Sequence, residues 1–244
     1  EFVGGIYNKD YKKVTRKVNA KNGENVDPRY VGREVLCKLY NFDCNYTMKN
    51  NVSVCAVEYQ GNGGFYQSDL HDSQRNNGQS VTNESHTVGP NSGISTETSL
   101  DMQMISQTAN NNKEWFWDVD GWLYEFAVDY FNAKERPDIV SMSWGWAEDE
   151  QCSITECGSN MTSDQYVQRV NNEYLKLSLL GKTICAAAGD AGAPGRTSET
   201  CSTNRPPTNA IFPGSSPWIV SVGATYVVSS NNKINWTTPL CQKQ

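Results

Sequence analysis

Apolar segments of strand length alternate along this chain with longer segments that carry apolar residues at helical spacing. Buried-strand patterns occupy residues 52–59, 138–144, 183–188 and 218–224, and helical patterns occupy residues 95–107 and 163–180. Strands that alternate with helices predict an α/β fold with a mostly parallel sheet flanked by helices. In such a sheet the ligand site lies beyond the carboxyl ends of the strands.

Three other stretches have different patterns. Residues 67–93 consist mostly of Asn, Ser, Gly and Asp, and we expect a long surface excursion there. Residues 115–132 are strongly aromatic and mostly compatible with a helix, which favours a place in the core. Residues 1–26 are polar and rich in Lys with little periodicity, so they read as an N-terminal arm or a processing remnant.

Two glycine turns follow expected strands. Gly145 ends the pattern at 138–144, and the turn from Gly189 to Gly192 ends the pattern at 183–188. Both turns therefore lie at carboxyl ends of strands, and this position alone places Asp190 near a site. The alternative is that Asp190 is only a turn-forming residue in a glycine-rich loop.

Two carboxylates lie four residues apart in the expected helix at 95–107. At this spacing Glu97 and Asp101 lie one above the other on the same helix face, where like charges repel. In a half-buried site such a pair shares a proton, and the pKa of one group rises. This arrangement gives a base that works in acid, where a histidine is already charged. The alternative is a solvated helix face with two unrelated acids.

The bulk composition bounds the class of protein. The chain has 244 residues, a net charge of −6 and eight cysteines. An acidic chain argues against nucleic acid or an anionic membrane as the main partner, and no apolar run has the length of a membrane span. The even cysteine number suits an oxidising compartment. We therefore expect a secreted or lysosomal globular protein.

Local disulfides and glycosylation sites agree with this expectation. The spacing of Cys37 and Cys44 allows a local disulfide, and Cys152 and Cys157 also form a candidate pair, with a metal site as the weaker option. Five Asn-x-Ser/Thr sequons are expected glycosylation sites, at Asn45, Asn51, Asn83, Asn160 and Asn235.

Four motifs occur in an order that is typical of one family. They are residues 97–101 (ETSLD), 140–145 (VSMSWG), 188–192 (AGDAG) and 212–217 (FPGSSP), the last followed by 222–225 (VGAT). This combination resembles the sedolisins, the serine-carboxyl peptidases, and most of all their lysosomal tripeptidyl-peptidase branch. The resemblance runs from about residue 27 to residue 225 and implies a subtilisin-like α/β sheet.

The resemblance assigns roles to matching positions. Glu97 matches the general base, Asp101 the acid that orients and tunes this base, and Asp190 the aspartate of the oxyanion hole. A serine hydroxyl needs such a base, and a protonated carboxyl can donate a hydrogen bond to an oxyanion, so the implied activity is confined to acid. The implied binding positions for a peptide or protein substrate are Ser141, Ser143, Trp144, Gly145 and Gly189.

The family's nucleophile is missing from this sequence. It lies in a G-T-S-A-x-x-P segment that has no counterpart here, and the family's calcium ligands also lie beyond residue 244. We therefore expect residues 27–244 to be a heavy chain whose fold is incomplete without a C-terminal segment or a second, light chain. That light chain would supply the serine and the calcium ligands, with Cys241 as a possible disulfide tether. Residues 1–26 would then be a propeptide remnant.

Three alternatives remain open on the sequence. The serine can lie in a further portion of the same chain, which is equivalent for function. The protein can be a non-catalytic relative that serves as a binding or structural protein. It can also be a neutral Ser-His-Asp subtilase, which would need His71 or His86 as its base.

Overall fold

The computed structural model describes most of the chain between residues 32 and 237. The described residues are 2–3, 6–7, 32–47, 52–59, 61, 63–190, 192, 209–224, 226–230 and 233–237. Most of the expected N-terminal arm lies outside this set, apart from β1 (Phe2–Val3) and β2 (Ile6–Tyr7), which pair antiparallel. Cys241 and the sequon at Asn51 also lie outside it.

A six-stranded sheet forms the centre of the molecule. Its strand order is β10-β8-β6-β3-β5-β4, and every pair in it is parallel. This sheet confirms the predicted α/β class. The strands are β3 (Ser53–Tyr59), β4 (His86–Val88), β5 (Lys113–Val119), β6 (Ile139–Met142), β8 (Thr183–Ala187) and β10 (Val220–Val222).

Two short antiparallel pairs accompany the sheet. One joins β7 (Trp146–Ala147) to β9 (Ile211–Phe212), and the other joins β11 (Tyr226–Ser230) to β12 (Lys233–Thr237). The helices are α1 (Arg33–Tyr40), α2 (Gln67–Asn76), α3 (Thr96–Thr108), α4 (Leu123–Asn132), α5 (Gln151–Ile154) and α6 (Ser163–Leu179), with a 3-10 turn at Glu148–Glu150.

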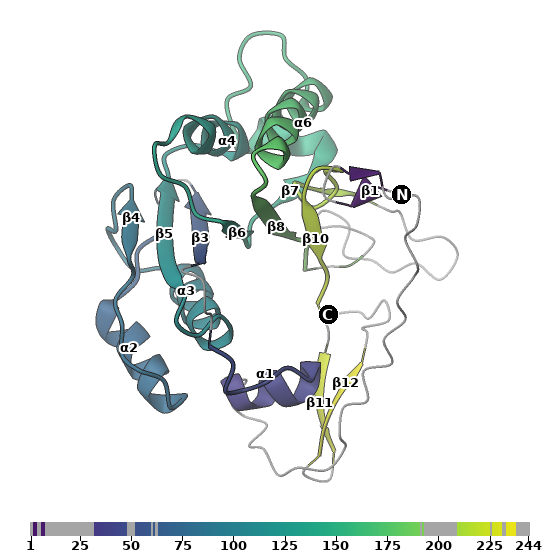
Figure 1. Ribbon diagram of the computed structural model, residues 1–244. Coiled ribbons are helices and arrows are strands. Elements are labelled where there is room, and N and C mark those ends of the chain that lie inside the picture. Colours follow the sequence, from purple (N-terminus) through teal and green to yellow (C-terminus); the bar gives the residue numbers. More distant parts are fainter. Residues whose placement is uncertain are drawn as a thin grey trace.

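Helices cover the sheet on both faces (Figure 1). Along β3, Cys55, Val57 and Tyr59 pack against α4 and α6 in the larger core cluster. Val54 and Ala56 point the other way and pack with residues of α2 and α3. Because side chains alternate along a strand, Glu58 belongs to the α2–α3 face.

Two stretches differ from the sequence expectation. The excursion at 67–93 contains a helix, α2, and a strand, β4. The buried residues of α2 are Leu70, Ser73 and Gln74, so its inner face is mostly polar and gives no apolar helical pattern. The stretch 115–132 is not one helical segment. Aromatic residues, which favour strands, form β5, and α4 starts only after Gly121.

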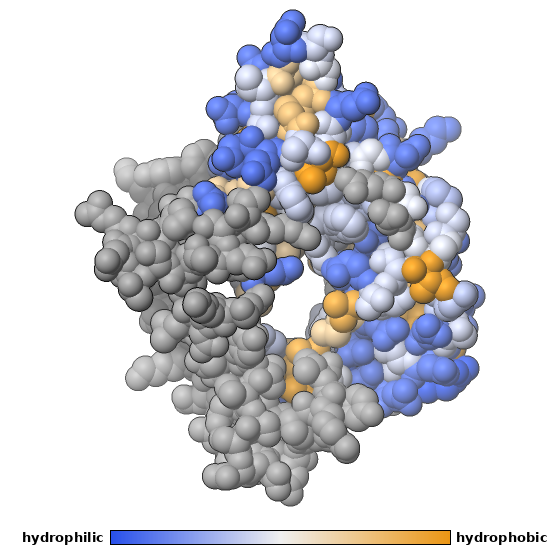
Figure 2. Space-filling view, turned by 180° about the vertical axis from the view of Figure 1, so that it is seen from behind, coloured by the Kyte–Doolittle hydropathy of each residue, from blue (hydrophilic) through white to orange (hydrophobic). Residues whose placement is uncertain are grey.

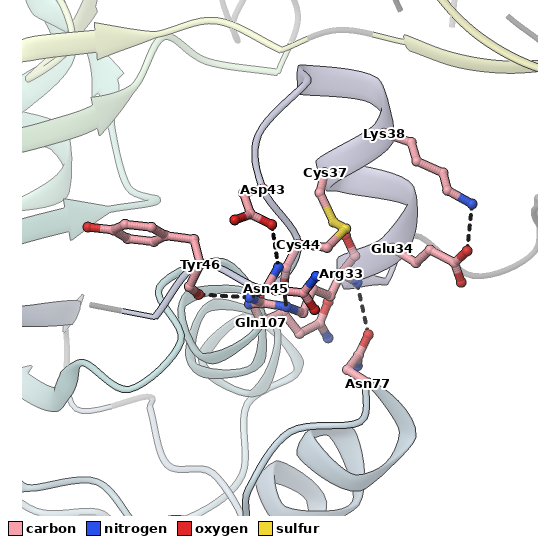
Figure 3. The surroundings of a disulfide bond; sticks show 10 residues. All are labelled: Arg33, Glu34, Cys37, Lys38, Asp43, Cys44, Asn45, Tyr46, Asn77 and Gln107. Atoms are coloured by element: carbon pink, nitrogen blue, oxygen red, sulfur yellow. Dashed lines mark hydrogen bonds and ion pairs between the residues drawn. A yellow bond between two sulfur atoms is a disulfide. The ribbon is translucent and has the colours of Figure 1, made fainter. Parts of the chain in front are cut away.

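Helix α1 is fixed to the rest of the fold by Arg33 and a disulfide (Figure 3). Cys37 pairs with Cys44, as expected, and the second expected pair, Cys152 and Cys157, also forms. The Arg33 side chain is buried and donates to the carbonyl oxygens of Cys44, Tyr46 and Gln107. Since Gln107 belongs to α3, this guanidinium ties α1 to the helix that carries Glu97 and Asp101.

One face of the molecule is mostly polar where it is described. Figure 2 shows one face on which hydrophilic residues dominate and apolar residues form separate spots. No helix among the described residues is long and apolar enough to cross a membrane.

We expect Arg33→Lys to destabilise the protein by about 2 kcal/mol, because a compact ammonium group lacks the wide planar fork with which the guanidinium reaches three separate carbonyl oxygens. The free energy of unfolding from urea denaturation measures this loss. The matched control is Arg75→Lys, which changes an exposed arginine that pairs with Asp72 and which should shift stability by less than about 0.5 kcal/mol. Equal losses in the two variants would contradict the anchoring role.

Candidate active site

Several acidic side chains meet at the carboxyl edge of the sheet. Glu58 is the last residue but one of β3, and the segment at Ser143 and Trp144 follows β6. Asp190 follows β8. The first turns of α3 bring Glu97 and Asp101 to the same edge. This is the position at which a parallel sheet is expected to bind its ligand.

Contacts at the start of α3 fix the position of its acidic turns. The Ser95 side chain caps the helix and accepts a hydrogen bond from the Thr98 amide at 3.4 Å. The Ser95 amide donates to the Gly64 carbonyl oxygen at 2.9 Å, so the helix start is held by the loop that leaves β3. Gly63 in that loop lies so close that a Cβ atom there would be 2.8 Å from Thr98 Oγ1 and 2.9 Å from Glu58 Cβ. Only glycine fits this contact between the strand and the helix.

Asp101 is a buried acid with a strongly raised pKa. Its exposed fraction is 8 %, and its pKa rises to about 6, because burial disfavours the charged form. A hydrogen bond from the Ser143 side chain lowers the pKa, and the charge on Glu97 raises it further. Ser143, expected at the substrate edge, therefore also serves as a partner of Asp101.

Glu97 links Asp101 to Asp190. It is half-buried, and its pKa is raised first by burial and then by the charge on Asp190. Asp190 itself is exposed on the turn after β8. The three acids named from the sequence thus interact electrostatically within one site, although they come from two distant segments of the chain.

Glu58 is a fourth acid of this site, and the sequence reasoning missed it. It is fully buried, and the indole Nε1 of Trp144 donates a hydrogen bond to its Oε2 at 2.8 Å. Burial raises the pKa of Glu58 to about 8, opposed by this hydrogen bond and reinforced by the charges on Asp101 and Glu97. The available signal was a single carboxylate within the apolar pattern at 52–59.

The other expected binding positions are placed by the sheet and by β9. Ser141 lies on β6 between Ala56 and Cys185 of the neighbouring strands. Gly189 has a φ of 97° and approaches Ile211 so closely that an added Cβ would lie 2.9 Å from its Cγ1. A Cβ atom added at Gly145 would lie 2.8 Å from Cγ2 of the same residue. The substrate-binding role of these positions stays a prediction.

Both histidines interact with residues outside the acidic site. His71 Nε2 lies 2.8 Å from Asn83 Oδ1 and 3.2 Å from Gln67 Nε2. His86 stacks on Trp115, with ring centroids 4.1 Å apart, and contacts Glu135. Neither ring contributes to the raised pKa of Glu58, Glu97 or Asp101.

Three of the five expected sequons are open to solvent. Asn45, Asn83 and Asn160 are exposed, as glycosylation requires. In the part of the chain that the structure describes, no group of three or more His, Cys, Asp or Glu side chains could hold a metal ion. The calcium ligands implied by the family resemblance were expected outside this chain, so no step below depends on them.

Comparison with known proteins identifies relatives along most of this chain. Physarolisin of Physarum polycephalum is 41 % identical over 227 residues, which cover 92 % of this chain and 39 % of that protein. Tripeptidyl-peptidase 1 of Mus musculus is 28 % identical over 254 residues, which cover 92 % of this chain and 40 % of that protein. No protein-family model matches. The chain thus spans about two fifths of the length of these curated relatives.

A solved structure has the same fold. It is a Pseudomonas sedolisin, a serine-carboxyl proteinase complexed with two molecules of pseudo-iodotyrostatin. The TM-score is 0.55 at 18 % sequence identity, over 74 % of this chain and 50 % of that one. The relatives, the shared subtilisin-like fold and the ordered motifs together show that this chain belongs to the sedolisin family, in its tripeptidyl-peptidase-like branch.

Proposed function

We propose that this chain provides the acidic part of the active site of a serine-carboxyl peptidase that works in acid. The observation that carries the proposal is the set of mutually interacting carboxyl groups at the carboxyl edge of the sheet. The substrate is a peptide or protein, cut internally or by removal of tripeptides from a free N-terminus. Peptides with free and with blocked N-termini separate these two modes, because a tripeptidyl peptidase cleaves only the free form.

Each acid has a distinct role in this proposal. Glu97 takes the proton of the attacking serine hydroxyl and later returns it to the leaving amine. Asp101 lies behind Glu97 and raises its proton affinity when ionised. In its protonated form the Asp190 carboxyl donates a hydrogen bond to the oxyanion of the tetrahedral intermediate. The serine that forms the acyl-enzyme lies outside this chain.

Glu58 is a positioning residue for this set of acids. Its pKa of about 8 means that it carries a proton throughout the acidic range, and Trp144 fixes one of its oxygens. A neutral Glu58 adds no further negative charge beside Asp101. The protons of the site are therefore distributed among Glu58, Asp101 and Glu97. When protons are lost at neutral pH, the negative charges on these carboxylates repel one another.

The edge of the sheet at β10 suits the docking of the remaining part of the enzyme. Val220 and Val222 have exposed fractions of 44 % and 51 %, which is unusual for apolar residues of a strand in an α/β sheet. On its outer side β10 has no neighbouring strand among the described elements. An unpaired edge with apolar side chains is a template for a further strand. The segment with the serine and calcium ligands would pair here, as a light chain or as a continuation of this chain.

The compartment follows from the same chemistry. A peptidase whose carboxylate base works in acid and whose oxyanion donor must be protonated works in a lysosome, an acidic vacuole or an acidic secretion. The two local disulfides and the exposed sequons agree with this route.

We expect Glu97→Gln or Asp101→Asn to lower kcat by about 10²- to 10⁴-fold, because an amide cannot accept the serine proton or support the base. The double variant should lose little more than either single one, since the two groups act as a unit. Peptide hydrolysis in acid measures the loss. His71→Ala and His86→Ala are the controls and should keep full activity, whereas a neutral subtilase would lose its activity with one of them.

We expect the wild-type protein to lose stability as pH rises. Glu58 ionises near its ordinary pKa of 4.5 when unfolded, but near 8 when folded, so between these values the folded state holds the extra proton. Stability from this group is complete below about pH 4.5 and falls by about 3 kcal/mol by pH 7. Urea unfolding across this range measures the slope. Glu58→Gln should reduce the slope and leave the part that comes from Asp101 and Glu114, whose pKa values are also raised, and the exposed Asp72→Asn should leave the slope unchanged. Equal slopes in all three proteins would contradict the assignment.

The location of the serine is tested by the intact mass of the native protein before and after reduction. We expect a second chain that contains the family's G-T-S motif and is released on reduction if Cys241 is the tether. A second chain that separates without reduction would agree with the peptidase proposal but would exclude Cys241 as a disulfide tether. A single species without a G-T-S segment would contradict the catalytic proposal.

A further inference from the structure

A second group of buried carboxyl and amide oxygens lies at the opposite, amino end of the sheet. Glu114 is the second residue of β5, and its exposed fraction is 4 %. It lines a cavity of about 250 Å³ together with Gln79 of the loop after α2 and Asn112 of the turn after α3. This cavity is bounded by elements of the α2–α3 face and plays no part in the peptidase chemistry proposed above.

Four oxygens in and beside the cavity are buried and have no hydrogen-bond donor in the part of the chain that the structure describes. They are Glu114 Oε1, Glu84 Oε2, Gln79 Oε1 and Asn112 Oδ1. Buried polar atoms in native proteins are normally paired. Three unpaired acceptors on residues that line the cavity, with a fourth on Glu84 nearby, therefore indicate a ligand that accepts electron pairs, such as a cation.

The amide groups are oriented so that their oxygens are the free ends. Gln79 Nε2 donates to the Ser106 carbonyl oxygen at 2.7 Å and to Asn110 Oδ1 at 3.2 Å. Asn112 Nδ2 donates to the Ala109 carbonyl oxygen at 2.6 Å. Because both nitrogens have acceptors, neither amide can turn around without losing these bonds.

The segment that carries Glu84 is held against the start of β5. The backbone amide and the hydroxyl of Ser85 both donate to the Glu114 carbonyl oxygen, at 2.7 and 2.9 Å. The two carboxyl groups are close enough that the charge on Glu84 raises the pKa of Glu114. Burial is the larger cause, and a hydrogen bond from the Ser106 side chain opposes both, so that this pKa rises to about 8. A charged Glu114 therefore needs compensation.

No described residue that lines the cavity is a Lys, Arg or His. Within the described lining, the compensation is left to a small cation or a proton. Calcium suits this surrounding, because it takes six to eight oxygen ligands from carboxylates, amide carbonyls and water in flexible geometry. The volume leaves room for the ion and several waters, each of which occupies about 30 Å³ in the liquid.

We propose that this cavity is a divalent-cation site that binds calcium through Glu114 and Glu84, with the amide oxygens of Gln79 and Asn112 as neutral ligands. The ion would join the loop after α2, the turn after α3 and the start of β5. With two carboxylates, the affinity belongs to the weak class of extracellular calcium sites, with Kd of about 10⁻⁴ to 10⁻³ M. The site differs from the calcium site implied by the family resemblance, whose ligands lie beyond residue 244.

Calcium titration of the native protein tests the proposal. Near pH 8, where Glu114 releases its proton readily, thermal unfolding and isothermal titration are measured with increasing calcium chloride. We expect calcium to raise the melting temperature of the wild type over the millimolar range. Glu114→Gln, which keeps the shape of the side chain, should fold without calcium and weaken binding by about 10- to 100-fold.

Two further variants make the result unambiguous. Glu84→Gln is the alternative if Glu114→Gln proves hard to prepare, and it should also weaken calcium binding. Glu173→Gln is the matched control on α6, on the other face of the sheet, where the carboxylate pairs with Lys176. It should respond to calcium as the wild type does. An unchanged calcium response in Glu114→Gln and Glu84→Gln, or no response in the wild type, would overturn the site and leave the peptidase proposal untouched.

Discussion

The burial of one carboxyl group organises the carboxyl edge of the sheet. Glu58 is fully enclosed on a central strand, where an unpaired charge costs several kcal/mol. The structure meets this cost with the Trp144 indole and with a pKa that keeps the group neutral until about pH 8. These two conditions require the segment after β6 to fold back over β3. They also require the acidic turns of α3 to lie within electrostatic reach, so one buried group links three elements.

The close contacts around this edge leave little freedom for the backbone. Gly63 lies against both Glu58 and Thr98, and Gly189 lies against Ile211 in a conformation with positive φ. A side chain at Gly63 would push the strand and α3 apart, and it would thereby separate Glu58 from Asp101. The geometry of the acids thus depends on glycines that carry no chemistry themselves, which is the usual situation where a loop must pass close to a packed site.

The sequence predicted a mostly parallel sheet, because β3, β6, β8 and β10 read as short apolar runs between helical patterns. It also predicted Glu97, Asp101 and Asp190 as members of one site. It did not predict α2, because the inner face of this helix is polar and shows no apolar helical pattern. Ser73 accepts a hydrogen bond from the Gln107 side chain, and the Gln74 side chain donates to Thr82 and Ser106. Glu58 was missed for the opposite reason. Its partner Trp144 is 86 residues away in the sequence, and only the fold brings the two together.

The two ends of the sheet solve the same electrostatic problem in different ways. Glu58 and Glu114 are both buried glutamates with a pKa near 8. At the carboxyl end, Glu58 has an indole donor and acidic neighbours, and a proton on the carboxyl compensates its burial up to about pH 8. At the amino end, Glu114 has the Ser106 hydroxyl as a donor but lies beside the Glu84 carboxylate and the unpaired amide oxygens of Gln79 and Asn112, and these oxygens favour a cation over a proton because they can coordinate it directly. The first environment suits a group that holds protons for chemistry in acid. The second suits an ion that holds three segments together, and the difference lies in the donors around each carboxyl rather than in its burial.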